Sequence, residues 1–476
     1  MTKTYRLRPM LHETVEATRT DVGSWAPGNE RFAFSRRRHS LDRLRATALP
    51  ALCIFAANTV VVVTHAQYPR AIVSAAILTL VYLAGLKLIG RSTWLSPLAL
   101  GVPVTTALGI ALALPAIALV DFWIPGFDVS RLELLLVTLS TFAVWTLYWS
   151  WPWASLREAP QRVLVVGRAD GGRELVEELQ ARHDLPFECA GFVDDDPAGG
   201  GRWLGDLDDL GGAINGQSID IVVFADARLR DRAMPVLLDA GRLDIRVVGL
   251  ADFYEHAFGR VPVDRLSQTW FMSLLYLYRG GYPSFFKRVF DLAFASVVLL
   301  FTAPLFPLIA LLIVVETRGP VFFRQVRVGE GGELFEILKF RTMVDGAEDE
   351  GRAVWAQEND RRITRVGKVL RKTRFDELPQ LWNVLRDEMS VVGPRPERPE
   401  FLELLEASVP HWTRRHLVKP GITGWAQVFC GYTSDAASAL DKLSYDLYYI
   451  KHRSPTLDFA VVAKTVTVML SGSGAK

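Results

Sequence analysis

The sequence predicts a membrane protein of the α plus α/β class, with a four-helix transmembrane bundle, a Rossmann-like α/β domain and a mainly helical third domain. Two observations support this prediction. Hydrophobic residues make up 50% of the 476 positions, and long uncharged runs gather in the first third and again after residue 290. Between these two regions, short apolar runs alternate with helix-like stretches. The chain is also longer than one ordinary core, so several domains are expected.

Four apolar segments of membrane-spanning length follow a polar and then basic leader, residues 1–45. The leader lacks the short apolar core and cleavage site of a signal peptide, so we expect it to stay attached. A run of about 20 apolar residues is long enough to cross the bilayer. The runs lie at about 46–64, 71–90, 97–120 and 132–152, within a predicted bundle at 46–155. Buried helices of a soluble domain are the alternative.

Basic residues beside these runs predict their orientation, because Lys and Arg in short loops are retained on the cytoplasmic side. The leader, the loop with Lys87 and Arg91, and the stretch with Arg157 and Arg162 would be cytoplasmic. The two intervening turns carry one Arg each and would face outward. An even number of crossings therefore returns the chain to the cytoplasm.

Residues 160–270 predict a Rossmann-like domain, because short apolar runs alternate there with helix-like stretches. The turn from Gly167 to Gly172 approximates a dinucleotide fingerprint, but Ala169 stands where a glycine lets a pyrophosphate approach the backbone. Nucleotide binding and a purely structural or regulatory role both stay open, and we assign no cofactor-binding residue. The domain could also mediate a homodimer.

The third predicted domain, residues 280–476, opens with an uncharged run that contains Pro304 and Pro307. Proline removes a helix hydrogen bond and clashes with the preceding turn, so the run should bend or break. Basic residues flank both of its ends, which disfavours placing either end outside. We predict a re-entrant helix at about 286–316 that bends at Pro304. A fifth spanning helix is the alternative.

Polar strings gather between residues 339 and 427, and one of them, DELPQLWNVL, predicts a helix. Leu378, Leu381 and Leu385 would form an apolar stripe on this helix. Asp376, Gln380 and Asn383 would lie on another face, which is polar. Because Pro379 fits a first turn, Asp376 and Glu377 would lie at the helix N-terminus, where an anion is favoured. An isolated pair of this kind would more often be a helix cap.

Basic side chains near this pair could balance a diphosphate: Lys339, Arg341, Arg371 and Arg374. The turn Gly393-Pro-Arg-Pro396 presents Arg395, for which a solvated surface turn is an equally open interpretation. Two adjacent carboxylates among cations suggest one nucleophile and one Mg²⁺ ligand. A carboxylate that attacks phosphorus would form an acyl-phosphate and divide one transfer into two steps.

Six ordered strings in the last third together resemble the bacterial sugar transferase family, the monotopic phosphoglycosyl transferases. They are FKRVFD, GPVFFRQVRVG, KFRTM, DELPQLWNVL, MSVVGPRPE and KPGITGWAQV. The preceding helices and Rossmann-like domain are similar to the family's large members, which initiate exopolysaccharide, capsule or O-antigen synthesis. The resemblance implies a multi-pass protein of the bacterial inner membrane, with a catalytic third domain that contains a re-entrant membrane helix and, like the Rossmann-like domain, faces the cytoplasm.

The resemblance also implies roles for single residues. Asp376 would attack the phosphate attached to the sugar of a UDP-sugar, with glucose or galactose expected, and release UMP. Glu377, together with Asp376, would bind Mg²⁺. Undecaprenyl phosphate would then take the phosphosugar in a ping-pong cycle. Lys339, Arg341, Arg371 and Arg395 are the candidate phosphate contacts, and Pro304 matches the family's helix-breaking proline, although Ala303 stands where some members have serine.

Other functions fit the sequence less well. A membrane-anchored nucleotide-sugar dehydratase needs an intact glycine fingerprint and a Tyr-x-x-x-Lys pair, and Lys451 has Leu447 four positions before it. A non-catalytic scaffold for polysaccharide assembly leaves the DELPQL and GPRP strings unexplained. The net charge of +2 does not favour a nucleic-acid partner. The three cysteines match no metal-ligand or disulfide spacing.

Overall fold

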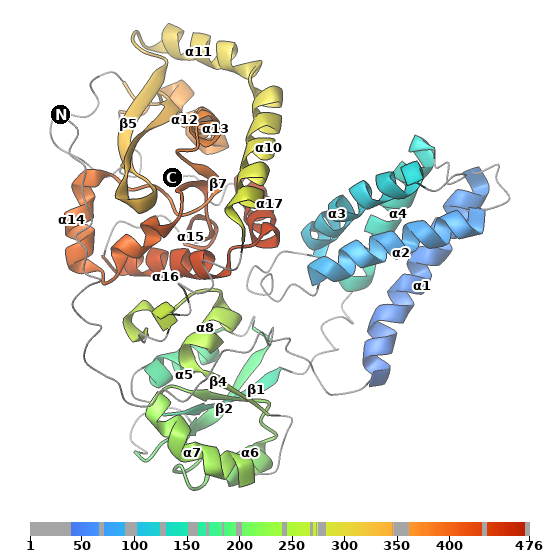
Figure 1. Ribbon diagram of the computed structural model, residues 1–476, viewed down its shortest axis with the longest axis vertical. Helices are drawn as coiled ribbons and strands as arrows, with labels where there is room; N and C mark the ends of the chain where they lie inside the picture. Colours follow the sequence, from blue (N-terminus) through green and yellow to red (C-terminus); the bar gives the residue numbers. More distant parts are fainter. Residues whose placement is uncertain are drawn as a thin grey trace. The chain divides into compact units, whose positions relative to one another are not determined.

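The computed structural model describes most of the chain and resolves two compact units (Figure 1), which are considered separately. The described residues are 40–65, 71–90, 102–123, 130–150, 160–167, 171–182, 185–196, 202–239, 245–266, 270–272, 274, 282–344, 346, 360, 362–430 and 436–471. One unit covers residues 31–258, and the other contains residues 259–476. Most of the predicted leader lies outside the described residues.

Four helices in the first unit correspond to the four predicted apolar segments. They are α1 (Ser40–His65), α2 (Ala71–Gly90), α3 (Val102–Trp123) and α4 (Arg131–Ser150). Helix α1 contacts α2 and α4, and α3 contacts the same two helices, so the four form a bundle. Helices α2 and α3 approach closely, because a Cβ atom added at Gly85 would lie 2.3 Å from the carbonyl oxygen of Gly109.

A polar cluster lies inside this bundle and joins three of its helices. The side chain of Asn58 on α1 is fully buried, and its Nδ2 donates to Thr79 Oγ1 on α2 at 3.1 Å. Ser140 Oγ on α4 donates to Asn58 Oδ1 at 2.8 Å. Because buried polar groups without partners are costly, these bonds favour one arrangement of the helices over others.

The predicted α/β domain contains one parallel sheet with the strand order β2-β1-β3-β4. Its strands are β1 (Gln161–Val166), β2 (Phe187–Val193), β3 (Ile221–Phe224) and β4 (Arg246–Gly249). Helices α5 (Gly172–Ala181) and α8 (Leu250–Phe258) cover one face, and α6 (Leu210–Gln217) and α7 (Ala227–Asp239) cover the other. The alternating structure predicted from the sequence is confirmed, whereas Ala169 lies outside the described residues.

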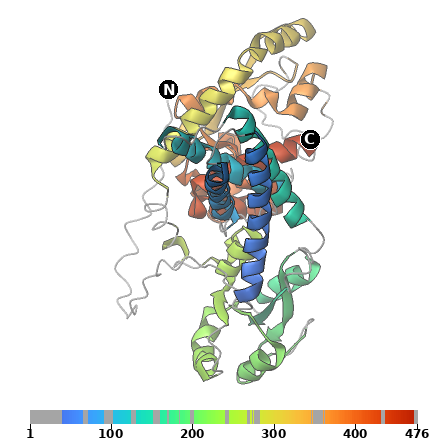
Figure 2. The same ribbon diagram turned by 90° about the vertical axis from the view of Figure 1, so that its right-hand side faces the viewer.

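The first long helices of the second unit are α10 (Ser284–Thr302) and α11 (Leu305–Glu316). The two helices meet at an angle of 62°, at a break where Pro304 is the N-cap of α11. The predicted break at Pro304 is therefore observed. Figure 1 and Figure 2 both show α11 at one end of this unit. By length and apolar composition, none of the described helices qualifies alone as a membrane span, and the bent pair α10–α11 does so jointly.

Large apolar side chains remain exposed along both arms of this bent pair. Leu300 and Phe301 on α10 are 73% and 75% exposed, and Val315 on α11 is 76% exposed. Contiguous apolar surface of this kind marks an interaction site in a folded protein. Phe306 and Ile309, by contrast, pack inward from α11 against Phe340.

An antiparallel hairpin follows α11 in the chain. Strand β5 (Phe322–Val328) pairs with β6 (Leu334–Phe340), and the register places Phe322 opposite Phe340 and Arg327 opposite Phe335. Because side chains alternate between the faces of a strand, the even-numbered residues of the pair share one face, where Phe340 packs against α11 and Phe322 and Val326 are exposed. Arg327, Ile337 and Lys339 lie on the opposite face, where they line a pocket.

The remaining elements surround this polar face. They are α12 (Arg365–Thr373), α13 (Gln380–Leu385), β7 (Ser390–Val392), α14 (Pro399–Ser408), β8 (Gly421–Thr423), α15 (Trp425–Phe429), α16 (Ala436–His452) and α17 (Pro455–Ser471). Strands β7 and β8 form a short parallel pair. The unit is mainly helical as predicted, with two small sheets that the prediction did not contain.

Candidate active site

The two adjacent carboxylates lie in a 3-10 turn, Phe375–Glu377, rather than in the first turn of a helix. Arg374 ends α12 in the left-handed conformation, with φ 60°, and turns the chain into this segment. Helix α13 begins only at Gln380, after Pro379. The predicted helix start at Asp376 is therefore wrong by four residues: the helix begins directly after Pro379, where the missing N–H group of proline costs no helix hydrogen bond.

Two residues of the predicted polar face, Gln380 and Asn383, lie on α13 and are buried. Asn383 Nδ2 donates to the carbonyl oxygen of Glu336 at 2.7 Å, and Asn383 Oδ1 accepts from the backbone N–H of Leu338 at 3.1 Å. The amide of Asn383 therefore makes the backbone hydrogen bonds that a neighbouring strand would make at this edge of β6. These two bonds hold α13 next to the strand that carries Lys339.

Glu377 is held by two cations that come from distant parts of the chain. Its Oε1 accepts from Lys339 Nζ at 3.1 Å and from both terminal nitrogens of Arg395 at 3.2 Å. Burial alone would raise the pKa of Glu377, but the charges of Lys339 and Arg395 outweigh burial and lower it to about 2. Glu377 is therefore ionised at neutral pH.

Asp376 has a different environment although it is the neighbouring residue. It is only 8% exposed, and its buried Oδ1 has no hydrogen-bond partner within the described part of the chain. Burial, followed by the charge of Glu377, raises the pKa of Asp376 to about 6, against the opposing effect of Lys339 and Arg371. Two carboxylates whose pKa values are pushed apart are typical of a catalytic pair, and Asp376 is the less stabilised anion.

The other basic residues predicted for the site divide into two groups. Arg371 stays near the carboxylates: its Nε donates to Thr342 Oγ1 at 2.9 Å, and its charge lowers the pKa of Asp376. Arg341 does not join them. Its guanidinium donates to the carbonyl oxygens of Thr317 at 2.8 Å and Arg318 at 3.2 Å, just after α11. This placement gives Arg341 a structural role at the end of α11 and does not support the predicted phosphate contact.

The turn that presents Arg395 is attached to strand β8. Gly393 N–H donates to the carbonyl oxygen of Thr423, and Gly421 N–H donates to that of Pro394, both at 2.9 Å. A Cβ atom added at Gly421 would lie 2.1 Å from the nitrogen of Gly393, so this approach requires glycine. Arg395 therefore projects from a rigid turn towards Glu377, and the alternative of a solvated surface turn is excluded.

A buried ion cluster fixes the same turn from behind, and the sequence analysis missed it. Arg415, 2% exposed, donates to the carbonyl oxygen of Arg395 at 3.1 Å. It also forms salt bridges with Glu397 at 3.1 Å and Asp446 at 2.7 Å. Burial raises the pKa of Asp446 to about 6 although Arg415 opposes this shift. Arg415 is a positioning residue, because it acts on the site through the backbone of Arg395.

Replacing Arg415 with Met is expected to destabilise the protein by about 3 kcal/mol, because two carboxylates would stay buried without their cation. Thermal unfolding of the purified variant checks this. The double variant Arg415→Met with Asp446→Asn should recover part of the loss. No recovery in the double variant would contradict the assigned ion pair.

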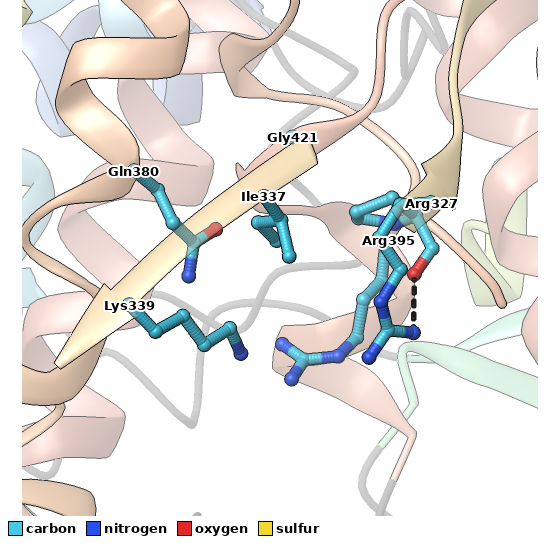
Figure 3. Close-up of a pocket in the computed structure, with 7 residues that line it drawn as sticks. Arg327, Ile337, Lys339, Gln380, Arg395 and Gly421 are labelled. Atoms are coloured by element: carbon cyan, nitrogen blue, oxygen red, sulfur yellow. Dashed lines mark hydrogen bonds between the residues drawn. The ribbon is translucent and has the colours of Figure 1, made fainter. Parts of the chain in front are cut away.

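One pocket opens beside these residues (Figure 3), lined by Arg327, Ile337, Lys339, Gln380, Arg395, Pro396 and Gly421. Lys339 and Gln380 reach into it from β6 and α13, and the two arginines reach into it from the other side. Its polar side chains are hydrogen-bond donors, and three of them are cations. The cations and other donors that line it are groups that bind phosphate oxygens.

The carboxylates provide few ligands for a metal ion. No group of three or more His, Cys, Asp or Glu side chains lies close enough to form a metal site in the described segments. The buried, unpartnered Oδ1 of Asp376 is nevertheless a free oxygen donor. Because Mg²⁺ keeps several waters and commonly binds one or two carboxylates plus substrate phosphates, these residues fit a metal that arrives with a diphosphate.

Comparison with known proteins matches this unit to an enzyme family. Residues 282–472 match the family model described as bacterial sugar transferase. The UDP-N-acetylgalactosamine-undecaprenyl-phosphate N-acetylgalactosaminephosphotransferase of Aeromonas hydrophila is 44% identical over 232 residues, which are 49% of this chain and 54% of that protein. The chain therefore spans about half the length of that relative.

Two relatives named UDP-glucose:undecaprenyl-phosphate glucose-1-phosphate transferase also match. The protein of Klebsiella pneumoniae is 32% identical over 313 residues, or 64% of this chain and 67% of that protein. The protein of Caulobacter vibrioides is 42% identical over 191 residues, or 40% of this chain and 71% of that protein. With the motifs, the family match and these identities in agreement, the chain belongs to the bacterial sugar transferase family.

Proposed function

We propose that this protein is a phosphoglycosyl transferase that moves a hexose-1-phosphate from a UDP-sugar to undecaprenyl phosphate and releases UMP. One observation carries the proposal: a buried carboxylate with a raised pKa, Asp376, stands beside an ionised partner, Glu377, that is bound to two cations next to a donor-lined pocket. The names of the relatives supply the substrate class. The first membrane step of exopolysaccharide, capsule or O-antigen synthesis is the corresponding role.

The reaction would proceed in two displacements at one phosphorus atom. In the first, a carboxylate oxygen of Asp376 bonds to the phosphorus attached to the sugar. The bond from that phosphorus to the bridging oxygen breaks, and UMP leaves with the electron pair. In the second, an oxygen of undecaprenyl phosphate bonds to the same phosphorus, and the acyl-phosphate bond breaks to restore the Asp376 carboxylate. Lys339 and Arg395 supply positive charge at the site throughout.

The exposed apolar surface of α10 and α11 supports a membrane location for this reaction. We propose that the bent pair enters the cytoplasmic leaflet and returns, which keeps Glu316 and the following basic residues on the cytoplasmic side. The bundle α1–α4 would span the bacterial inner membrane. With cysteine placed near Arg324, reagents that cannot cross the membrane should fail to label intact cells and should label inverted vesicles. Labelling of intact cells would contradict re-entry.

The proposed activity is tested with purified full-length protein, radiolabelled UDP-glucose, UDP-galactose or UDP-N-acetylgalactosamine, and undecaprenyl phosphate. At least one donor should give UMP and a lipid-linked sugar diphosphate. The relatives are named for glucose and for N-acetylgalactosamine, so their names leave the sugar open. The donor that gives product in this panel identifies it. Absence of a lipid-linked product with any nucleotide sugar would contradict the proposed function.

Mg²⁺ is the proposed cofactor, and Asp376 and Glu377 would hold it together with the substrate phosphates. When bound, Mg²⁺ would neutralise charge on the diphosphate. Chelation with EDTA should abolish UMP formation, and added Mg²⁺ should restore it. Full activity after exhaustive chelation would contradict this cofactor.

Activity should depend on pH through Asp376. Only the ionised carboxylate attacks phosphorus, and its pKa is raised to about 6. The rate of UMP release should therefore be constant above about pH 7 and fall about tenfold per pH unit well below pH 6. Asp446 titrates in the same range, so the profile is also measured for Asp446→Asn. A profile that loses its acid limb in this variant would assign the limb to Asp446 instead.

A further inference from the structure

Gln380 carries a buried amide nitrogen that no described residue satisfies. It is the first residue of α13 and only 2% exposed. Its Nε2 has no hydrogen-bond partner in the described part of the chain, and its side chain reaches into the pocket (Figure 3). Because buried donors are nearly always paired, this one indicates an acceptor that comes from a ligand.

Arg327 is a second group whose position the proposed chemistry leaves unexplained. Its NH1 donates to the carbonyl oxygen of Pro396 at 3.2 Å and its NH2 to Gln325 Oε1 at 2.6 Å, so both acceptors are neutral. Its buried Nε has no partner among the described residues. Burial, then the charge of Arg395, lowers the pKa of Arg327 to about 10, and the guanidinium stays cationic at neutral pH.

One end of the pocket lies beside the carboxylates and the other end lies at Arg327. Lys339 and Arg395 bind Glu377, whose neighbour Asp376 is the proposed nucleophile. Neither carboxylate lines the pocket, which extends from Lys339 and Arg395 to Arg327. The attacking and leaving oxygens of a displacement at phosphorus lie roughly in line. A leaving group expelled by Asp376 departs on the side away from that carboxylate, and this pocket, which Asp376 does not line, offers donors to receive it.

We propose that Arg327 and Gln380 bind the phosphate of the departing nucleotide, the one that is not attached to the sugar. The inference rests on the proposed function and deepens it. As the bridging bond breaks, this phosphate gains a negative charge. The guanidinium of Arg327 and the amide of Gln380 are hydrogen-bond donors that can stabilise this charge. Neither donor is used to bind Glu377, which Lys339 and Arg395 hold. The pocket would thus favour UMP as a leaving group and retain it as a product inhibitor.

The test measures the inhibition constant of UMP, with full-length protein and a fixed concentration of UDP-sugar. Gln380→Met keeps the length of the side chain and removes the donor, and should raise the inhibition constant about tenfold. Arg327→Met removes a cation and should raise it about a hundredfold. Arg324→Met is the matched control, because Arg324 lies on the other face of β5, is 69% exposed, and should leave UMP inhibition unchanged.

A second measurement separates this role from a structural one. The KM for undecaprenyl phosphate, measured with the same variants, should change less than the inhibition constant of UMP. An unchanged inhibition constant in both variants, or a change confined to the lipid substrate, would overturn the assignment. Wild-type protein that releases no UMP from any UDP-sugar would instead contradict the proposed function. UMP binding to that protein, measured by equilibrium dialysis, would still test the pocket.

Discussion

Replacing Asp376 with Asn is expected to reduce UMP release at least about a thousandfold and, at the same time, to make the folded protein more stable at neutral pH. The activity is lost because the amide cannot form the covalent intermediate. The stability rises because the pKa of Asp376 is raised in the folded state, so the ionised carboxylate opposes folding. Between about pH 4 and pH 6 the free energy of unfolding should fall as pH rises, and Asn avoids a penalty of about 3 kcal/mol at pH 7.

Thermal unfolding of wild type and Asp376→Asn at pH 5 and pH 7.5 measures this effect. The gain in Tm should be several degrees at pH 7.5 and smaller at pH 5, where the wild-type carboxyl is mostly protonated. A variant that is less stable than wild type would show that Asp376 has a structural role as a turn or helix cap.

Replacing the neighbouring Glu377 with Gln is expected to have the opposite effect on stability. Glu377 Oε1 lies 3.1 Å from Lys339 Nζ and 3.2 Å from a terminal nitrogen of Arg395. With Gln at this position, both cations would face a neutral amide and lose their shared counter-charge. We expect a loss of about 2 kcal/mol, less than for a fully buried pair because both cations are partly exposed. UMP release should also fall strongly, because the two cations and the proposed Mg²⁺ would lose their carboxylate.

The pH dependence of this second effect follows from the lowered pKa of Glu377. The stabilisation is fully present above about pH 4.5 and is lost as pH falls towards about 2. Chemical denaturation of wild type and Glu377→Gln should therefore give a difference that narrows between pH 5 and pH 3. A constant difference over this range would mean that the ion pairs are not its source.

Local signals in the sequence were sufficient for the long apolar helices α1–α4 and for the break between α10 and α11. Proline at position 304 acts through the geometry of its own ring, so no distant contact is needed to predict the bend. The parallel sheet was predicted for a similar reason, because residues 163–166 of β1 and all of β3 are uninterrupted apolar runs. These elements depend on side chains that are near each other in the chain.

The hairpin β5–β6 and the pair β7–β8 were not predicted. Both faces of strand β5 mix polar and apolar residues, because one face stays largely exposed and the other lines the pocket, and without its partner this pattern does not identify a strand. Strands β7 and β8 have three residues each and come from positions 390 and 421, so their pairing leaves no local pattern. Long-range pairing of short strands is determined by the tertiary structure.

The candidate site was predicted in part. The motifs identified Asp376, Glu377, Lys339 and Arg395, which the structure brings together. The motif KFRTM also suggested Arg341, which is two residues after Lys339. The side chain of Arg341, however, contacts the end of α11 and not the carboxylates. Arg415 could not be identified, because its partners come from separate elements and nothing near it in the sequence marks a buried ion pair.

The proposed mechanism requires a phosphosugar bound covalently to Asp376. Intact-protein mass spectrometry after incubation with UDP-sugar, without undecaprenyl phosphate, detects such an intermediate. We expect wild type to gain the mass of one hexose phosphate, fragmentation to place this mass on the peptide containing Asp376, and added undecaprenyl phosphate to remove it. Lipid-linked product formed at the normal rate by Asp376→Asn, or an adduct located on any other residue, would rule out this role of Asp376.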